Sequence, residues 1–206
     1  MNKHLIYHIY PHADRKILYE NLSYIGSFDH IFDKKIYKVA YDDITSASLI
    51  LRSFNRDLQY IENNKSLGET VGFIKFLEQI LNEDPDGITY VGTTAGVSKP
   101  ISERENVKAW ARSIYMLCLA NPTHIEKIFS SGDYDTVGCF KKTVPMEKGG
   151  PKPAPWHFSG GQFWISNRAL LKTNWKDIAV CRHGVEMYPG YMIDVNRAYN
   201  LFDTDM

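Results

Sequence analysis

Short apolar runs alternate along the chain with segments in which apolar residues recur every three or four positions. The short runs are rich in β-branched and aromatic residues, which is typical of buried strands. They cover residues 5–10, 36–41, 58–61, 88–91 and 134–140. The segments with helical spacing predict helices. They cover residues 15–25, 46–54, 66–81 and 102–120, with a short helix beginning at Thr123.

This alternation predicts an α/β fold: a central, mostly parallel mixed sheet with helices on both faces. The 206 residues are enough for one domain with a full core, so we expect a single domain over residues 1–206, whether or not the chain is part of a longer protein. In an open sheet of this kind, ligands bind at the carboxyl ends of the strands.

Two further segments carry local signals. Ser66 and Glu69 have the spacing of a capping box, which predicts the start of the helix that follows. Residues 143–156 form a predicted loop with four prolines and two glycines. A loop of this length in a compact domain is usually functional, and we expect it to close over a bound ligand.

The overall charge is balanced. Lysine plus arginine number 24 and aspartate plus glutamate number 24, so the net charge is zero. Proteins that bind nucleic acid through its phosphates normally carry a basic surplus, so we expect no nucleic-acid partner. No apolar run approaches the length of a membrane span, and three widely spaced cysteines are typical of free thiols in a reducing, cytoplasmic setting.

Several common catalytic signatures are missing from the sequence. The chain has no G-x-x-x-x-G-K-[ST] phosphate loop and no G-x-G-x-x-G after its first predicted strand, which disfavours P-loop ATPases and dehydrogenases. It also lacks H-E-x-x-H and G-x-S-x-G, so zincin and α/β-hydrolase chemistry have no support.

Polar residues near the ends of the strands fit a phosphate-bearing ligand. Tyr10 follows the first strand. Gly68-Glu69-Thr70 opens a predicted helix whose free N–H groups could hold phosphate or ribose, although Glu69 fits the capping box equally well. The segment Gly92-Thr93-Thr94-Ala95-Gly96, with Lys99 nearby, fits close approach of a diphosphate or an ordinary surface turn.

The run His157-Phe158-Ser159-Gly160-Gly161-Gln162-Phe163-Trp164 is the most unusual part of the sequence. Two adjacent glycines in an aromatic, strand-like run provide no packing, but they suit a place where substrate lies against the backbone. A bulged strand with core aromatics is the alternative. Glu186 adds a carboxylate that could act as a base or a nucleophile, could bind an acceptor hydroxyl, or could lie on the surface.

These segments together resemble a group of GT-A glycosyltransferases from bacteria and large viruses. That group shows a G-R-D-like helix start, a Y-I-H-T-K-G strand end and an H-F-S-G-N-F-W-W run, and the order matches over residues 5–190. Within the group, the chain resembles the N-terminal glycosyltransferase domain of chlorella-virus capsid-glycan enzymes.

The resemblance implies a UDP-sugar donor, a divalent metal, most often manganese, and a saccharide or glycoprotein-glycan acceptor in viral or surface glycan synthesis. It places the nucleobase of the donor near Tyr10 and the transferred sugar near the run 157–164. We expect His157 and Glu186 to be catalytic. The expected donor-binding residues are Tyr10, Gly68, Glu69, Thr70, Thr93, Thr94, Gly96 and Lys99. The expected sugar- and acceptor-binding residues are Ser159, Gly160, Gly161 and Trp164.

The chain departs from this pattern at the metal site. GT-A enzymes commonly have a D-x-D pair after the strand that covers residues 88–91 here, but this chain has Thr93 and Thr94 there. Three D-x-D triplets occur elsewhere, at residues 84–86, 133–135 and 203–205. The first two precede strands, so they belong at the other edge of the sheet, and the metal ligands stay unassigned.

Two other functions fit the same residues. A non-catalytic carbohydrate- or nucleotide-binding module would use the aromatic residues for stacking. A sugar nucleotidyltransferase would share the sheet architecture, although the chain lacks a glycine-rich loop with Lys or Arg after the first strand.

Overall fold

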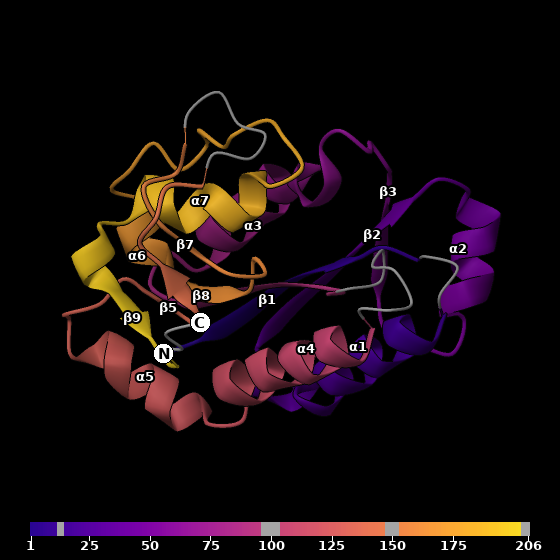
Figure 1. Ribbon diagram of the computed structural model, residues 1–206, viewed down its shortest axis with the longest axis horizontal. Helices are drawn as coiled ribbons and strands as arrows, with labels where there is room; N and C mark the ends of the chain where they lie inside the picture. The colour runs from indigo at the N-terminus through magenta and orange to yellow at the C-terminus, as the bar shows by residue number, and fades with distance from the viewer. Residues whose placement is uncertain (12–14, 96–103, 147–152, 203–206) are drawn as a thin grey trace.

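A seven-stranded sheet with helices on both faces forms the centre of the molecule (Figure 1). The computed structural model describes residues 1–11, 15–95, 104–146 and 153–202. The strand order is β3-β2-β1-β4-β8-β5-β9, and β8 runs antiparallel to both of its neighbours while the other pairs are parallel. The predicted α/β fold with a mostly parallel mixed sheet is confirmed.

The strands of this sheet are β1 (Lys3–Ile9), β2 (Lys34–Tyr41), β3 (Leu58–Glu62), β4 (Ile88–Thr93), β5 (Thr136–Gly138), β8 (Phe163–Ser166) and β9 (Ala198–Asn200). A second, two-stranded sheet pairs β6 (Lys141–Lys142) with β7 (His157–Phe158). The helices are α1 (Arg15–Ser27), α2 (Ile44–Leu51), α3 (Phe73–Glu83), α4 (Arg104–Leu119), α5 (Pro122–Ser130), α6 (Asn167–Leu170) and α7 (Gly184–Met192). Three short 3-10 helices are η1 (Asp29–Ile31), η2 (Gly68–Thr70) and η4 (Val195–Arg197).

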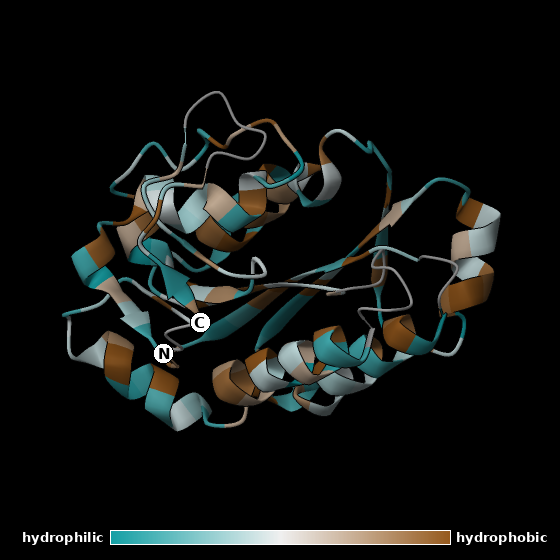
Figure 2. Cartoon of the chain, viewed as in Figure 1, coloured by the Kyte–Doolittle hydropathy of each residue, from teal (hydrophilic) through white to brown (hydrophobic). Residues whose placement is uncertain are grey.

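The helices form two layers. In Figure 1, α1, α4 and α5 cover one face of the sheet, and α3, α6 and α7 cover the other. Successive side chains of a strand point to opposite faces, so each strand contributes to two cores. Tyr7 and Tyr90 pack in the core beneath α1 and α4, whereas Ile6 and Val91 pack against α3 and α7. The helices of both layers carry hydrophobic and hydrophilic residues side by side (Figure 2), as expected where one side of a helix faces the sheet.

The start of α3 differs from the prediction. Glu69 lies in η2, and the helix begins only at Phe73, after Gly72 in a left-handed conformation with φ of 68°. The Ser66 hydroxyl donates to Asn64 instead of capping the helix. The predicted capping box is therefore wrong, and Glu69 is left for another role.

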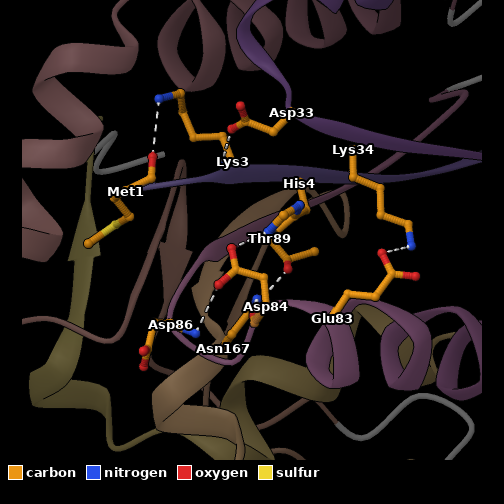
Figure 3. Close-up of polar contacts among 10 residues, drawn as sticks. All are labelled: Met1, Lys3, His4, Asp33, Lys34, Glu83, Asp84, Asp86, Thr89 and Asn167. Carbon is orange, nitrogen blue, oxygen red and sulfur yellow. Dashed lines mark hydrogen bonds and ion pairs between the residues drawn. The ribbon is translucent and has the colours of Figure 1, made fainter.

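The two D-x-D triplets within the described residues lie at the amino edge of the sheet, as expected. The Asp84 carboxylate meets His4 Nε2 at 2.7 Å, near the start of β1 (Figure 3). The Asn167 side chain donates to the Asp84 carbonyl, and Arg168 pairs with Asp86. Asp135 pairs with Arg197 just before β5. These aspartates hold turns together, and the third triplet lies outside the described residues.

No helix in the described part of the chain is long and apolar enough to cross a membrane.

Candidate functional site

Three buried polar side chains lie in one row across the carboxyl ends of three neighbouring strands. His8 of β1 is in register with Lys38 of β2 and with Thr93 of β4. Each of these residues is at most 6% exposed. Burying a polar group costs free energy unless the group is hydrogen-bonded, so a row of such groups needs an explanation. We therefore take the face of the sheet under α3 and α7 as the candidate functional site.

Lys38 holds η2 over the end of the sheet. Its ammonium group donates to the carbonyl oxygens of Glu69 at 2.6 Å and Val71 at 2.8 Å. Burial lowers the pKa of Lys38 to about 7, and the charge of Glu69 partly opposes this shift. The Thr70 hydroxyl donates to the Cys181 carbonyl at 2.7 Å, which ties η2 to the segment before α7.

Glu69 and Glu186 form a pair of like charges. Burial and then the charge of Glu186 raise the pKa of Glu69 to about 7, whereas Lys38 and a hydrogen bond from Thr93 oppose that rise. A carboxyl group whose pKa is raised by burial and by a neighbouring carboxylate is a common arrangement in acid–base catalysis. The structure thus brings together Glu69 and Glu186, which are 117 positions apart in the sequence (186 − 69).

The glycine pair makes room for these carboxylates. Gly160 and Gly161 both have positive φ, at 88° and 62°. The Gly160 N–H donates to Glu186 Oε1 at 2.9 Å, and His183 Nδ1 lies 3.3 Å from Glu186 Oε2. A Cβ at Gly161 would lie 3.4 Å from Glu69 Oε2, so the backbone passes directly beside both acids. The backbone of these glycines thus approaches protein side chains closely, and substrate binding at the same place stays a prediction.

His157 is near the acids but does not contact them within hydrogen-bonding distance. It is half-buried in β7, and its Nδ1 is buried with no partner in the described part of the chain. Burial lowers the pKa of His157, and the charge of Glu186 partly offsets this. His157 is therefore neutral near pH 7 and can accept a proton or a hydrogen bond.

A second polar group lies at the ends of β1, β2 and β3. The Tyr10 hydroxyl donates to Asp42 Oδ2 at 3.1 Å, and Asn63 Nδ2 donates to Asp42 Oδ1 at 2.9 Å. The Tyr10 N–H donates to Thr94 Oγ1 at 3.1 Å, which connects this group to the end of β4. An aromatic ring beside an exposed carboxylate and an amide suits a nucleobase, because it offers both stacking and hydrogen bonds to ring N–H groups.

One predicted site residue is placed elsewhere. Trp164 is fully buried, stacks on Phe32, and donates its indole N–H to the Cys118 carbonyl at 2.8 Å. It faces the α1 and α4 layer, so it cannot stack on a sugar, and its predicted ligand role is wrong. Phe163 packs in the core on the opposite face. Phe158 is also fully buried, so all three aromatic residues of the run belong to the core.

The other predicted site residues divide into two groups. Those that the structure brings to the carboxyl edge are Tyr10, Gly68, Glu69, Thr70, Thr93, Thr94, His157, Ser159, Gly160, Gly161 and Glu186. Gly96 and Lys99 lie outside the described residues. Gly92 of β4 has no room for a side chain, because a Cβ there would lie 2.9 Å from the Tyr90 ring and 3.0 Å from the Tyr7 ring.

Sequence reasoning missed Lys38, Asp42 and Arg182. Lys38 follows Lys34 and Lys35 in a strand, a pattern that resembles a solvated edge. Asp42 stands beside Asp43, whose side chain caps α2 through Ser46 N–H. Arg182 is exposed, packs its Cγ close to Gly68, and lowers the pKa values of both Tyr10 and Glu69 by its charge, against the larger upward effect of burial. The signal for Asp42 was its position directly after a strand.

The described residues show no complete metal site. They contain no group of three or more His, Cys, Asp or Glu placed to hold a metal ion. Glu69 and Glu186 offer two carboxylates, which are suitable ligands for a hard divalent cation. A cation at this pair would need further oxygens from a ligand such as a diphosphate.

A separate open cavity of about 340 Å³ lies at the other side of the molecule, between α6 and η4. Arg168 and Arg197 line it, but Arg168 pairs with Asp86 and Arg197 pairs with Asp135. None of the predicted site residues lines this cavity.

Comparisons with known proteins add little to this geometry. No protein-family model matches the chain, and no curated protein matches it. A solved structure described as "4-diphosphocytidyl-2C-methyl-D-erythritol synthase" is similar, with 13% sequence identity and a TM-score of 0.45. The similarity covers 96% of this chain and 92% of the other. A likeness at this identity and TM-score carries no argument about the function of this chain.

Proposed function

We propose that the chain transfers a sugar from a UDP-sugar to a saccharide acceptor, with the chemistry at Glu69, Glu186 and the backbone of Gly160-Gly161. The observation that carries this proposal is the pair of acids Glu69 and Glu186, which both lie beside the glycine turn of residues 159–161 at the carboxyl edge of the sheet. Ligands bind at this edge in open α/β sheets.

The polar groups divide the proposed donor into two parts. The nucleobase of the donor would stack near Tyr10 and form hydrogen bonds with Asp42 and Asn63, whose side chains already form one hydrogen-bonded group. The diphosphate would lie between this group and the acids, beside η2 and the end of β4. Arg182 contributes a positive charge on that path.

In the reaction, the bond between the anomeric carbon and the diphosphate oxygen breaks, and its electron pair leaves with UDP. A new bond forms between the same carbon and an acceptor oxygen, whose proton passes to a base. We assign that base to Glu186, which Gly160 N–H and His183 hold in place. His157, kept neutral by burial, would bond to an acceptor hydroxyl.

A divalent cation remains part of the proposal, with Glu69 as the residue that would hold it, since Glu186 is assigned as the base. When bound, it would neutralise charge on the departing diphosphate. The loop 143–156 would cover the donor. Residues 147–152 of this loop lie outside the described residues, and Met146 pairs with Ala154 across its base.

Thermal-shift measurements with UDP, GDP and CMP, each with and without manganese, test the binding half of this proposal. We expect UDP to raise the melting temperature most. A product assay then separates the alternatives: release of UDP from a UDP-sugar supports glycosyl transfer, whereas release of pyrophosphate from a nucleoside triphosphate and a sugar phosphate supports nucleotidyl transfer. Binding of UDP-sugar with no turnover favours a binding module, and no stabilisation by any nucleotide contradicts the proposal.

A further inference from the structure

A buried polar network lies on the face of the sheet opposite from Glu69 and Glu186, beneath α1 and α4. Its side chains are each at most 2% exposed. They form two hydrogen-bonded groups, Tyr7 with Tyr115 and Asn21, and Tyr90 with Gln162, and the groups adjoin because the Gln162 side chain is close enough to Tyr115 to lower its pKa. A polar network in an apolar core costs free energy unless it is satisfied, so its position directly below the ligand-facing loops calls for an explanation.

Asn21 of α1 binds the backbone just after β4 in both directions. Its Oδ1 accepts the Ala95 N–H at 3.1 Å, and its Nδ2 donates to the Ala95 carbonyl at 3.1 Å. The same side chain accepts from Tyr115 at 2.7 Å and donates to Ile17 at 2.9 Å. The amide thus uses two donors and two acceptor positions, which no other side chain of this size provides.

Tyr115 of α4 extends this contact to the end of β4 itself. Its hydroxyl lies 2.7 Å from Asn21 Oδ1 and 3.0 Å from the Thr93 carbonyl, so its single proton is directed at both acceptors. The Tyr7 hydroxyl lies 2.5 Å from it on the other side. Burial raises the pKa of Tyr115, while the neighbouring Tyr7 and Gln162 side chains partly offset that rise.

Gln162 connects the network to the glycine turn of residues 159–161. Its Oε1 accepts from the Tyr90 hydroxyl at 2.7 Å, while its Nε2 is buried without a partner in the described residues. Gln162 directly follows Gly161. The glycine turn also packs on α4, since a Cβ at Gly160 would meet the Trp110 ring at 2.3 Å. The helix α4 therefore contacts both ligand-facing segments.

We infer that Asn21, Tyr115 and Gln162 are positioning residues that hold segments 93–95 and 159–162 in one fixed arrangement for the donor. Asn21 and Tyr115 form hydrogen bonds with the backbone of Ala95 and Thr93. Gln162, which adjoins the glycine turn, is held by the Tyr90 hydroxyl. This inference rests on the proposed nucleotide-sugar site, but the ordering of the two segments is measurable without any ligand.

The test compares Tyr115→Phe with Tyr37→Phe. Both remove one hydroxyl from a tyrosine that is at most 1% exposed, but the Tyr37 hydroxyl donates to Asp29, toward the amino end of β2. We expect faster hydrogen exchange at the Ala95 amide in Tyr115→Phe only, by about tenfold, as loss of one buried hydrogen bond implies. We also expect UDP to bind about fivefold more weakly to that variant and with unchanged affinity to Tyr37→Phe.

Equal exchange and equal UDP affinity in the two variants overturn the inference. Faster exchange at Ala95 in a protein whose wild type binds no nucleotide supports the positioning role and contradicts the proposed function instead. If Tyr115→Phe does not fold, Gln162→Met serves as the second variant. It must speed exchange at residues 159–162 and leave the thermal stability within that of Tyr37→Phe, and unchanged exchange there also overturns the inference.

Discussion

At the scale of single residues, the site is defined by charges that are costly to bury. Glu69, Lys38 and His8 all have pKa values displaced by burial, in the direction that favours the neutral form. Such groups lower the stability of the fold, and they persist where chemistry needs them. The buried row at the carboxyl edge therefore distinguishes functional residues from the aspartates at the amino edge, which only hold turns.

The elevated pKa of Glu69 predicts a pH-dependent stability. A carboxyl with a folded-state pKa of about 7 against a usual value of 4.5 binds its proton more tightly when folded. It therefore destabilises the protein progressively as pH rises from about 4.5 to 7. Glu69→Gln should leave the melting temperature nearly unchanged at pH 5 and raise stability by about 1–3 kcal/mol at pH 8. Glu62→Gln, at an exposed carboxyl, controls for the substitution, and a gain that is equal at both pH values contradicts the account.

At the scale of elements, the short pieces between the regular strands and helices carry the site. The 3-10 helix η2 and the glycine turn 159–161 both depend on glycines with positive φ and on side chains from distant elements. Sequence patterns indicated the glycines but not the side chains that hold them. Lys38 holds η2 by hydrogen bonds, and α4 packs against the glycine turn.

Gly160→Ala tests the packing of the glycine turn against α4. Alanine costs about 1 kcal/mol at a positive φ, and the clash with Trp110 adds about 1–3 kcal/mol. Gly132→Ala is a matched control, because Gly132 has φ of 77° and nothing within 4 Å of its Cβ position. Chemical denaturation should show the larger loss in the free energy of unfolding for Gly160→Ala. Equal losses would mean that the glycine turn does not pack on the helix as described.

Lys38→Met tests the support of η2. The substitution keeps the apolar stem but leaves two carbonyls without their donor, which should cost about 1–3 kcal/mol at pH 8. Hydrogen exchange at residues 68–72 should become faster, whereas Lys34→Met, which loses an ion pair with Glu83, should leave those amides unaffected. Unchanged exchange at 68–72 would show that η2 is held by other contacts.

At the scale of the whole molecule, the order of strands and helices from β1 to β5 was readable from hydrophobic periodicity, whereas α6, α7 and β9 in the last third of the chain were not predicted. The site was readable only in part. Tyr10 and Thr93 were found because they follow or end strands, but the facing of Glu69 and Glu186 depends on α7 packing over η2, a contact between segments 117 positions apart in the sequence (186 − 69). Trp164 was misassigned because a strand residue beside a glycine pair gives no sign of which face it occupies.

The central claim is that the reaction occurs at the carboxyl edge of the sheet and not at the amino edge, where the D-x-D triplet of residues 84–86 lies. Turnover of a UDP-sugar, followed as UDP release, tests this in Glu186→Gln and Asp84→Asn, both of which keep a polar amide in place of the carboxylate. The account predicts a loss of about 100-fold or more in kcat for Glu186→Gln, as expected for removal of a general base, and activity near wild type for Asp84→Asn. Full activity in Glu186→Gln together with a large loss in Asp84→Asn would contradict it.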